Sequence, residues 1–355
     1  MKIAVLSIAK PAAGTGNGTT EYAFQLILRL REMGQEVDEV YAIEDSKRND
    51  IMGLVNTQIT FPRKIAKIAK MDYDIAHITI QEIGFAARIL KENGFKGKVV
   101  STVHDLTRLS NKLYQGLLQK SYNRIVAKSI EDSLKYSDYI TFNSQQTMDE
   151  VFERFGPMKN ARLIWHGTRR SFLNEPIQKK NDRIFRVGHV GALGDHKNVI
   201  AMLHVAEHLK GNDKIKFLIY GTGHQKENIE KYKAEKKLDN VMLMGFAPED
   251  KLIEIYDSFD AFVLPSNYEG LSHQILEAGA RELPIIVFKK ARIPEAVTKH
   301  CLKAEDEKDM ARIIADLQKR GFDKKEKAAA TKYYREFTWD RTVKEMFELY
   351  KELMA

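Results

Sequence analysis

Short apolar runs alternate along the chain with segments in which apolar residues recur at helical spacing. The runs at 3–8 and 261–264 are short and unbroken, as is typical of strands buried on both faces of a parallel sheet. The segment after the first run predicts an amphipathic helix, because apolar residues recur every three or four positions at Tyr22, Leu26, Leu30 and Met33. The alternation predicts an α/β protein built on open parallel sheets.

The series of strands and helices occurs twice, which predicts two domains. With 355 residues, the chain is longer than a single core usually serves. A polar stretch at 169–183, which contains Pro176, separates the two series. We therefore expect a first domain at 1–168, a linker at 169–183, a second domain at 184–337 and a terminal helix at 338–355.

The junction between the run at 261–264 and the next helix is the most informative stretch. Pro265 ends the predicted strand, Ser272 can cap a helix, and Pro284 forbids its continuation. Ligands bind at such junctions in open parallel sheets, because the first turn of the helix offers unpaired N–H groups and a positive dipole to an anion. We expect Gly270 to let the backbone come close to that ligand.

Two glutamates flank this turn. Glu269 lies in the loop, and Glu277 lies about one turn into the predicted helix, on the face that also carries His273. Two acids at this spacing also occur on the solvated face of a helix, so the pair alone does not decide the chemistry.

The stretch from 265 to 284 reads Pro-Ser-x-x-Glu-Gly-x-x-x-x-x-Leu-Glu-Ala-x-Ala-x-x-x-Pro. It resembles the donor-site signature of the retaining nucleotide-sugar glycosyltransferases of family 4, which have the GT-B fold. The resemblance implies two Rossmann-like domains facing a central cleft, with a C-terminal helix that crosses back to the first domain. It also implies that Glu269 is catalytic and meets the transferred sugar, and that Glu277 binds the ribose of the donor. The other donor-binding residues that it implies in the second domain are Gly221, Gly245, Phe246, Gly270, Leu271 and Ser272.

A glycine-rich loop at 14–19 follows the first strand. It is not a regular G-x-G-x-x-G, and no acidic residue closes the next strand in the dinucleotide manner, so the sequence argues against a nicotinamide site. The resemblance implies that Gly16 and Gly18 lie opposite the donor phosphates and that Asn17 lies on the acceptor side. A loop without any ligand is the alternative.

Two strands of the first half carry histidines. His104 and Asp105 directly follow the run at 99–103, and a neighbouring carboxylate would fix the tautomer of the imidazole. The resemblance implies that His104 is catalytic and approaches the transferred sugar, and that Asp105 lies on the acceptor side. His77, in the predicted strand at 74–80, is a weaker candidate, because a strand histidine is often structural.

The second half departs from the family at one position. Lys197 corresponds to the lysine that neutralises the donor diphosphate, and we group it with the catalytic residues, whereas Ala192 stands where the family has an arginine. One diphosphate cation is therefore missing. Arg186 or His189 could replace it only if the fold brings either side chain to the phosphates.

The composition is that of an ordinary soluble protein, with 43% hydrophobic and 30% charged residues. No apolar run is long enough to span a bilayer, and the opening is too short for a signal peptide, so we expect a cytoplasmic protein. The single cysteine, Cys301, excludes an internal disulfide and a cysteine-clustered metal site. We expect neither a metal nor a cofactor, because no Asp-x-Asp run is placed to hold a metal on the donor diphosphate.

The formal net charge of +8 favours an anionic partner, but charge alone does not distinguish a nucleotide, a nucleic acid and an acidic lipid. Basic and apolar residues alternate in the predicted helices at 62–70 and 108–136. This pattern is typical of helices that bind anionic membranes, and equally of basic helices packed on a sheet. We expect a peripheral contact with the inner face of a membrane, through a face built from Lys64, Lys67, Lys112, Lys120, Arg124 and Lys128.

The resemblance implies transfer of a hexosyl unit, with retention, from a nucleoside diphosphate sugar to a glycan or lipid-linked acceptor in envelope polysaccharide or glycolipid synthesis. A UDP-sugar is the favoured donor and a GDP-sugar the next, and no nucleic-acid partner is expected. Two alternatives stay open. One is a non-catalytic nucleotide-sugar-binding protein of the same fold, which Ala192 favours. The other is a different GT-B enzyme, such as a sugar-nucleotide epimerase or a glycan phosphorylase.

Overall fold

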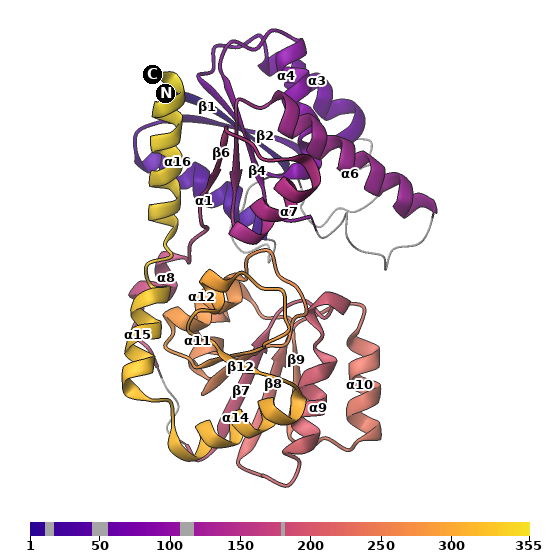
Figure 1. The fold of residues 1–355 in the computed structure, drawn as a ribbon, viewed down its shortest axis with the longest axis vertical. Coiled ribbons are helices and arrows are strands. Elements are labelled where there is room, and N and C mark those ends of the chain that lie inside the picture. The colour runs from indigo at the N-terminus through magenta and orange to yellow at the C-terminus, as the bar shows by residue number, and fades with distance from the viewer. Residues whose placement is uncertain (11–17, 45–55, 107–116, 179–181) are drawn as a thin grey trace. The chain divides into compact units, whose positions relative to one another are not determined.

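The computed structural model describes residues 1–10, 18–44, 56–106, 117–178 and 182–355 (Figure 1). Contacts divide the chain into two compact units. Unit 1 comprises Met1–His166 and Trp339–Ala355, and unit 2 comprises Gly167–Thr338.

Unit 1 is a six-stranded parallel sheet covered by helices. Its strands lie in the order β2-β1-β3-β4-β5-β6, and neighbouring strands pair in parallel. The strands are β1 (Lys2–Ala9), β2 (Glu36–Ile43), β3 (Ile75–Ile78), β4 (Lys98–Val103), β5 (Tyr139–Phe142) and β6 (Ala161–Leu163). The helices are α1 (Gly18–Glu32), α3 (Phe61–Ile68), α4 (Phe85–Glu92), α6 (Leu117–Tyr136), α7 (Gln145–Phe155) and α16 (Trp339–Met354), with short helical turns at Asn56–Thr60 and Gln81–Ile83.

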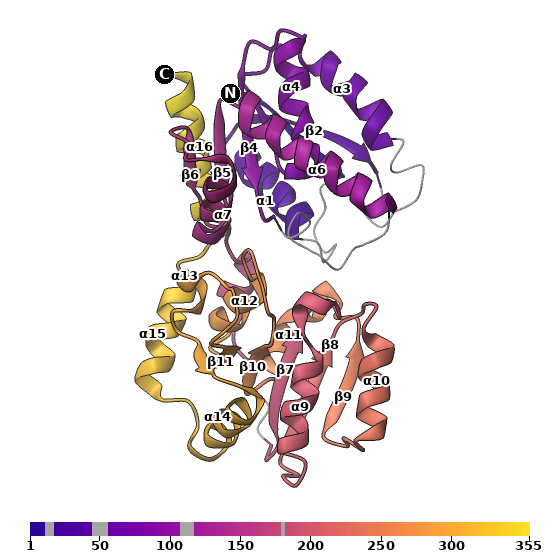
Figure 2. The same ribbon diagram turned by 45° about the vertical axis from the view of Figure 1, so that its right-hand side comes forward.

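The last helix, α16, completes the core of unit 1. Its buried residues Trp339, Val343 and Met346 pack in one apolar cluster with Ile3 of β1 and Leu26 of α1. Figure 2 shows the helix beside the edge of the sheet at β6. The C-terminal helix therefore returns to the first domain, as the resemblance implied.

Unit 2 is a second six-stranded parallel sheet, in the order β12-β11-β10-β7-β8-β9. The strands are β7 (Phe185–Val190), β8 (Ile215–Tyr220), β9 (Val241–Gly245), β10 (Ala261–Leu264), β11 (Ile285–Phe288) and β12 (Leu302–Ala304). The helices are α8 (Arg170–Asn174), α9 (Ile200–His208), α10 (Lys226–Glu235), α11 (Leu252–Asp257), α12 (His273–Ala280), α13 (Glu295–Thr298), α14 (Glu307–Arg320) and α15 (Lys324–Tyr334), with short turns at Asp195–Lys197 and Glu249–Lys251. The two sheets confirm the predicted α/β class. No helix in the described ranges is long and apolar enough to cross a bilayer.

The stretch predicted as a polar linker is in large part folded onto unit 2. Residues 170–174 form α8, and Phe172 is buried there against the ring of Tyr256, with 5.5 Å between the ring centroids. Arg281, directly after α12, is fully buried and pairs with Asp257 of α11 at an Nη2–Oδ2 distance of 2.6 Å.

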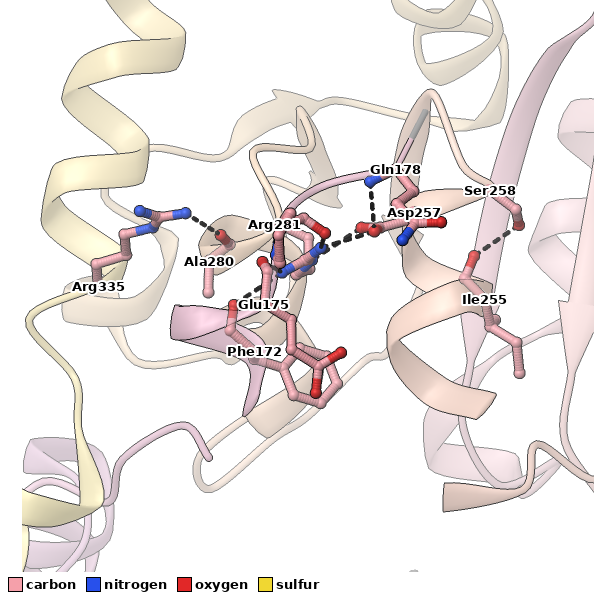
Figure 3. A network of polar contacts seen from close by, with 10 residues as sticks. Phe172, Glu175, Gln178, Ile255, Asp257, Ser258, Ala280, Arg281 and Arg335 are labelled. Atoms are coloured by element: carbon pink, nitrogen blue, oxygen red, sulfur yellow. Dashed lines mark hydrogen bonds and ion pairs between the residues drawn. The ribbon is translucent and has the colours of Figure 1, made fainter. Parts of the chain in front are cut away.

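Arg281 also holds the backbone of this stretch (Figure 3). Its guanidinium donates to the carbonyl oxygens of Phe172, Glu175 and Pro176 at 3.2, 2.7 and 3.0 Å. The Asp257 carboxylate accepts the N–H of Gln178 at 2.9 Å. The sequence did not indicate this anchoring, because the contacts use main-chain groups, which leave no apolar pattern in the sequence.

We expect Arg281→Met to destabilise unit 2 by about 3–5 kcal/mol, because it leaves the Asp257 carboxylate buried without its cation. Adding Asp257→Leu should recover part of the loss, since no unpaired charge then remains. The matched control is Arg312→Met, which breaks a surface pair with Asp309 and should cost less than about 1 kcal/mol. Urea denaturation measures the three variants. Equal losses from Arg281→Met and Arg312→Met would contradict the anchoring role.

Candidate active site

The loop between β10 and α12 carries the residues that the sequence placed at the donor site. β10 ends directly before Pro265, and the Ser272 hydroxyl caps α12 by accepting the N–H of Ile275 at 3.4 Å, which confirms the predicted cap. Within the described residues, the backbone N–H groups of Gly270 and Leu271 have no hydrogen-bond partner. Open donors beside a helix N-terminus are suited to bind an anion.

Lys197 and Glu269 form a buried ion pair at this loop. The Nζ–Oε1 distance is 2.7 Å, and both side chains are buried. Lys197 ends the short turn after β7, and Asn198 follows it in the left-handed conformation, with φ 49°. The Asn198 side chain donates to the carbonyl oxygen of Pro265 at 3.2 Å. This bond fixes the lysine loop to the glutamate loop, so the fold brings the predicted diphosphate lysine and the predicted catalytic glutamate together.

Neither candidate for the missing diphosphate cation takes that role. Arg186 lies near the start of β7 and pairs with Asp182 at 2.5 Å. His189 is buried, and its Nδ1 lies 3.0 Å from the carbonyl oxygen of Val263. A carbonyl only accepts, so Nδ1 carries the proton and Nε2 is an acceptor, without a partner among the described residues. Burial lowers the pKa of His189 to about 4, so the ring is neutral near pH 7.

The carboxylate of Glu277 is held by two donors. Its Oε1 lies 3.0 Å from Nη2 of Arg169, and its Oε2 accepts the Tyr256 hydroxyl at 2.8 Å. Arg169 also pairs with Glu249 at 2.6 Å. Sequence reasoning missed Arg169, Tyr256 and Glu249, because each lies in a segment without a motif.

Gly221 brings the ends of three neighbouring strands close together. Its N–H donates to the carbonyl oxygen of Gly245 at 2.7 Å, and an added Cβ would lie 1.8 Å from the carbonyl oxygen of Gly191. A side chain at this position would therefore force these loops apart. Phe246, directly after β9, is 62% exposed, which leaves its ring available to a flat ligand.

His104 is buried in unit 1 directly after β4. Its Nε2 lies 2.7 Å from the carbonyl oxygen of Thr79, so Nε2 carries the proton and Nδ1 is left as an acceptor. Burial lowers the pKa of His104, which keeps the ring neutral near pH 7. The expectation that the Asp105 carboxylate fixes the tautomer was wrong, because a main-chain carbonyl does so.

Buried histidines gather around Tyr22 in the described part of unit 1. The ring centroids of His77, His104 and His166 lie 6.0, 5.2 and 4.4 Å from that of Tyr22. His77 is fully enclosed: its Nε2 lies 2.8 Å from Thr102 Oγ1 and 3.2 Å from the Tyr22 hydroxyl, and its Nδ1 contacts the hydroxyl of Tyr350. These contacts give His77 a structural role in the core.

The chain matches two adjoining family models. Residues 16–171 match Glycosyltransferase Family 4, and residues 172–336 match Glycosyl transferases group 1. The chain belongs to the family 4-like, group 1 glycosyltransferases.

Known proteins are similar to the chain in sequence or in fold. Over 161 residues the chain is 31% identical to the poly(ribitol-phosphate) alpha-N-acetylglucosaminyltransferase of Staphylococcus aureus (strain COL), and this match covers 45% of the chain and 31% of that protein. The fold is similar to that of sucrose-phosphate synthase from Thermosynechococcus elongatus, with a TM-score of 0.75, 21% identity and coverage of 100% and 99% of the two chains. It is also similar to Anabaena Alr3699/HepE in complex with UDP and glucose, with a TM-score of 0.72, 14% identity and coverage of 98% and 99%. The chain spans 27% and 31% of the length of the first two curated relatives that it matches.

The predicted site residues divide between the two units. His104 and Asp105 lie in unit 1, and the donor-binding residues that follow Lys197 lie in unit 2. Gly16 and Asn17 lie outside the described residues, and Gly18 is the first residue of α1.

No metal cluster is present among the residues that the structure describes: no group of three or more His, Cys, Asp or Glu side chains could hold an ion. The sequence does contain an Asp-x-Asp run at Asp72 and Asp74, directly before β3. The Asp74 carboxylate accepts the N–H of Lys2 at 2.7 Å. This run therefore lies at the amino ends of the strands, on the opposite edge of the sheet from the loop of His104.

The buried histidines make the stability of the protein depend on pH. Burial lowers the pKa of His77 to about 3 and that of His189 to about 4, whereas each takes up a proton near pH 6.5 in the unfolded chain. Between about pH 6.5 and 4 the unfolded state therefore binds more protons, and the free energy of unfolding falls as the pH falls.

We expect His77→Gln to make this dependence shallower by up to about 1.4 kcal/mol per pH unit, because one of the titrating groups is removed. His208→Gln is the matched control, since His208 is exposed, and it should leave the slope unchanged. Urea denaturation at several pH values measures both slopes. An unchanged slope in His77→Gln would show that His77 is not held neutral in the folded state.

Proposed function

We propose that the protein transfers a hexosyl unit from a nucleoside diphosphate sugar to a glycan or lipid-linked acceptor, with retention at the anomeric carbon. A UDP-sugar is the favoured donor and a GDP-sugar the next. The observation that carries the proposal is the buried Lys197–Glu269 pair, beside the open N–H groups of Gly270 and Leu271. This pair lies at a strand-to-helix junction, where open parallel sheets bind their ligands.

In the proposed reaction, the donor diphosphate exchanges partners with this ion pair. Lys197 turns its ammonium group to a phosphate oxygen, and Glu269 accepts hydroxyl groups of the transferred sugar. The ammonium offsets about one unit of charge, so the N–H groups at the start of α12 offset most of the remainder. Lysine and amides together replace a metal ion in this role.

The other residues act at either end of the donor. Glu277 accepts the ribose hydroxyls, Phe246 packs on the base, and neutral His104 approaches the transferred sugar through Nδ1. The bond from the anomeric carbon to the diphosphate oxygen breaks, and the acceptor oxygen bonds to that carbon on the same face. The leaving diphosphate oxygen takes the acceptor's proton.

The comparisons support the choice of donor and acceptor class. Anabaena Alr3699/HepE was solved with UDP and glucose, which favours a UDP-sugar here. The Staphylococcus aureus relative is named for adding N-acetylglucosamine to poly(ribitol-phosphate), which favours a glycan or polymer acceptor in envelope synthesis.

A second candidate function is non-catalytic binding of a nucleotide sugar. The observation that favours it is Ala192, because neither Arg186 nor His189 supplies the cation that is missing there. A binding protein would hold the donor without releasing its nucleoside diphosphate. A different GT-B enzyme would instead give an epimerised sugar nucleotide or a sugar phosphate.

Incubation with UDP-, GDP- and ADP-hexoses tests the proposal. We expect release of the nucleoside diphosphate from at least one donor, in excess chelator as well as with Mg²⁺, and a product that keeps the anomeric configuration of the donor. Lys197→Ala should weaken UDP binding by about 1.5–3 kcal/mol in calorimetry and leave uridine binding unchanged, because the lysine meets the phosphates. Lys231→Ala, at an exposed lysine of α10, is the control. Equal losses for UDP and uridine would refute the role of Lys197, and failure of every donor to react would favour the binding protein.

We also propose that unit 1 contacts an anionic membrane surface. Helix α4 packs against both α3 and α6, and the exposed basic side chains described on α3 and α6 include Lys64, Lys67, Arg124 and Lys128. Lys128 has acidic partners in Glu131 and Asp132, so it contributes less than the sequence suggested. Lys112 and the side chain of Lys120 lie outside the described residues.

Sedimentation with liposomes tests this contact. The double variant Lys64→Glu/Lys67→Glu should bind anionic liposomes about tenfold or more weakly at low salt, because each basic residue near the surface contributes about 1 kcal/mol. Lys231→Glu/Lys233→Glu makes the same charge change in unit 2 and should bind as the wild type does. No excess of wild-type binding to anionic over neutral liposomes would remove the proposal.

A further inference from the structure

Glu277 differs from an ordinary surface glutamate in how fully its carboxylate is held. The side chain is 12% exposed, and each of its two oxygens receives one hydrogen bond from a neighbouring element. Nη2 of Arg169 lies 3.0 Å from Oε1, and the hydroxyl of Tyr256 lies 2.8 Å from Oε2. Both donors are far from Glu277 in the sequence, so their meeting is a product of the tertiary fold.

The number of acceptor positions on this carboxylate limits what it can bind. A carboxylate oxygen has two lone pairs, so Arg169 and Tyr256 use one position on each oxygen and leave one on each. Two remaining acceptors on one carboxylate match two hydroxyl groups on adjacent carbons. A ribose presents such a pair at its 2′ and 3′ carbons.

Tyr256 is suited to act as a permanent donor. Its side chain is fully buried, and burial together with the charge of Glu277 raises the pKa of its hydroxyl well above the usual value. The hydroxyl therefore stays protonated throughout the working pH range, and its only role toward Glu277 is to donate.

Arg169 is fixed by contacts on three sides. Its guanidinium joins Glu277 to Glu249, at 2.6 Å, and lies over the ring of Phe172 with 5.2 Å between its Cζ and the ring centroid. The same Phe172 ring packs on Tyr256, and the Phe172 carbonyl is held by Arg281 (Figure 3). Both donors to Glu277 therefore pack against the buried ring of Phe172. The backbone of Phe172 is in turn anchored by the buried pair of Arg281 with Asp257.

We propose that Arg169 and Tyr256 are positioning residues that aim the Glu277 carboxylate at the two adjacent ribose hydroxyls of the donor nucleotide. The inference rests on the proposed function, and it assigns to the stretch at 169–176 a role in recognising the nucleoside. A nucleotide that lacks the two hydroxyls leaves the held carboxylate without partners, so the site selects ribonucleotides over their dideoxy forms.

Calorimetry tests the proposal. Titration with UDP, GDP and ADP first identifies which nucleotide binds, and the same nucleotide in its 2′,3′-dideoxy form then measures the preference for ribose. We expect Tyr256→Phe and Arg169→Lys each to lower this preference by about threefold to tenfold, because the carboxylate loses one of its two fixed donors. Adding Tyr256→Phe to Glu277→Gln should lower the preference no further than Glu277→Gln does alone, since the tyrosine acts only through the carboxylate.

A matched control separates positioning from packing. Tyr232 donates to Glu207 at 2.7 Å elsewhere in unit 2, so Tyr232→Phe removes the same kind of bond and should leave the preference unchanged. Equal weakening of the ribo and dideoxy forms in Tyr256→Phe, which keeps the buried ring, would overturn the proposal and leave Tyr256 a packing role. An unaltered preference in both positioning variants would overturn it too, with the proposed function intact. Failure of the wild type to bind any of the three nucleotides would instead refute the proposed function.

Discussion

A buried charge must be matched by an opposite charge, and the pair of Lys197 with Glu269 imposes this constraint on two loops of unit 2 at once. Removing two charges from water costs several kcal/mol per ion, which only close contact between them offsets. The loops after β7 and β10 must therefore keep a fixed spacing, and the bond from Asn198 to the carbonyl of Pro265 maintains it. An anion that enters here meets a cation that is already desolvated and already in place.

Two more ion pairs of unit 2 differ in burial. Arg281 and Asp257 are almost fully enclosed and serve to anchor the backbone after Gly167. The side chains of Arg169 and Glu277 are 19% and 12% exposed, so they combine a fixed geometry with access for a ligand. The most deeply buried pair, Arg281 with Asp257, therefore holds the fold, whereas the less buried pairs can bind a ligand. All of these residues lie in unit 2, which makes this unit the donor-binding half in our account.

Local signals made the β10–α12 junction predictable from the sequence. Pro265 and Ser272 each act on the backbone within a few residues, so the strand end and the helix cap could be placed without knowledge of the fold. The helix end could not, because α12 ends at Ala280, before Pro284 forbids its continuation. The same holds for the alternation that predicted two parallel sheets. Lys197 and Glu269 could be named from the family resemblance, but their contact could not.

Contacts between distant segments could not be predicted. Arg169 precedes Glu277 by 108 residues, and Arg281 reaches carbonyl oxygens 105 to 109 residues earlier. A carbonyl is present at every residue, so a segment held by its carbonyls has no characteristic side chains. The sequence therefore predicted a polar linker at 169–183. The structural role of His77 could not be predicted for the same reason. Its contacts come from α1, β4 and α16, which are far apart in the sequence, and they make it a core residue.

The central claim is that the Lys197–Glu269 pair marks the place where the donor diphosphate binds. A crystal structure of the protein with UDP tests it most directly. Our account predicts a phosphate oxygen within hydrogen-bond distance of Lys197 Nζ and of the N–H groups at the start of α12, with the ribose at Glu277. UDP bound elsewhere, with no phosphate contact to Lys197 or to these N–H groups, would contradict the account.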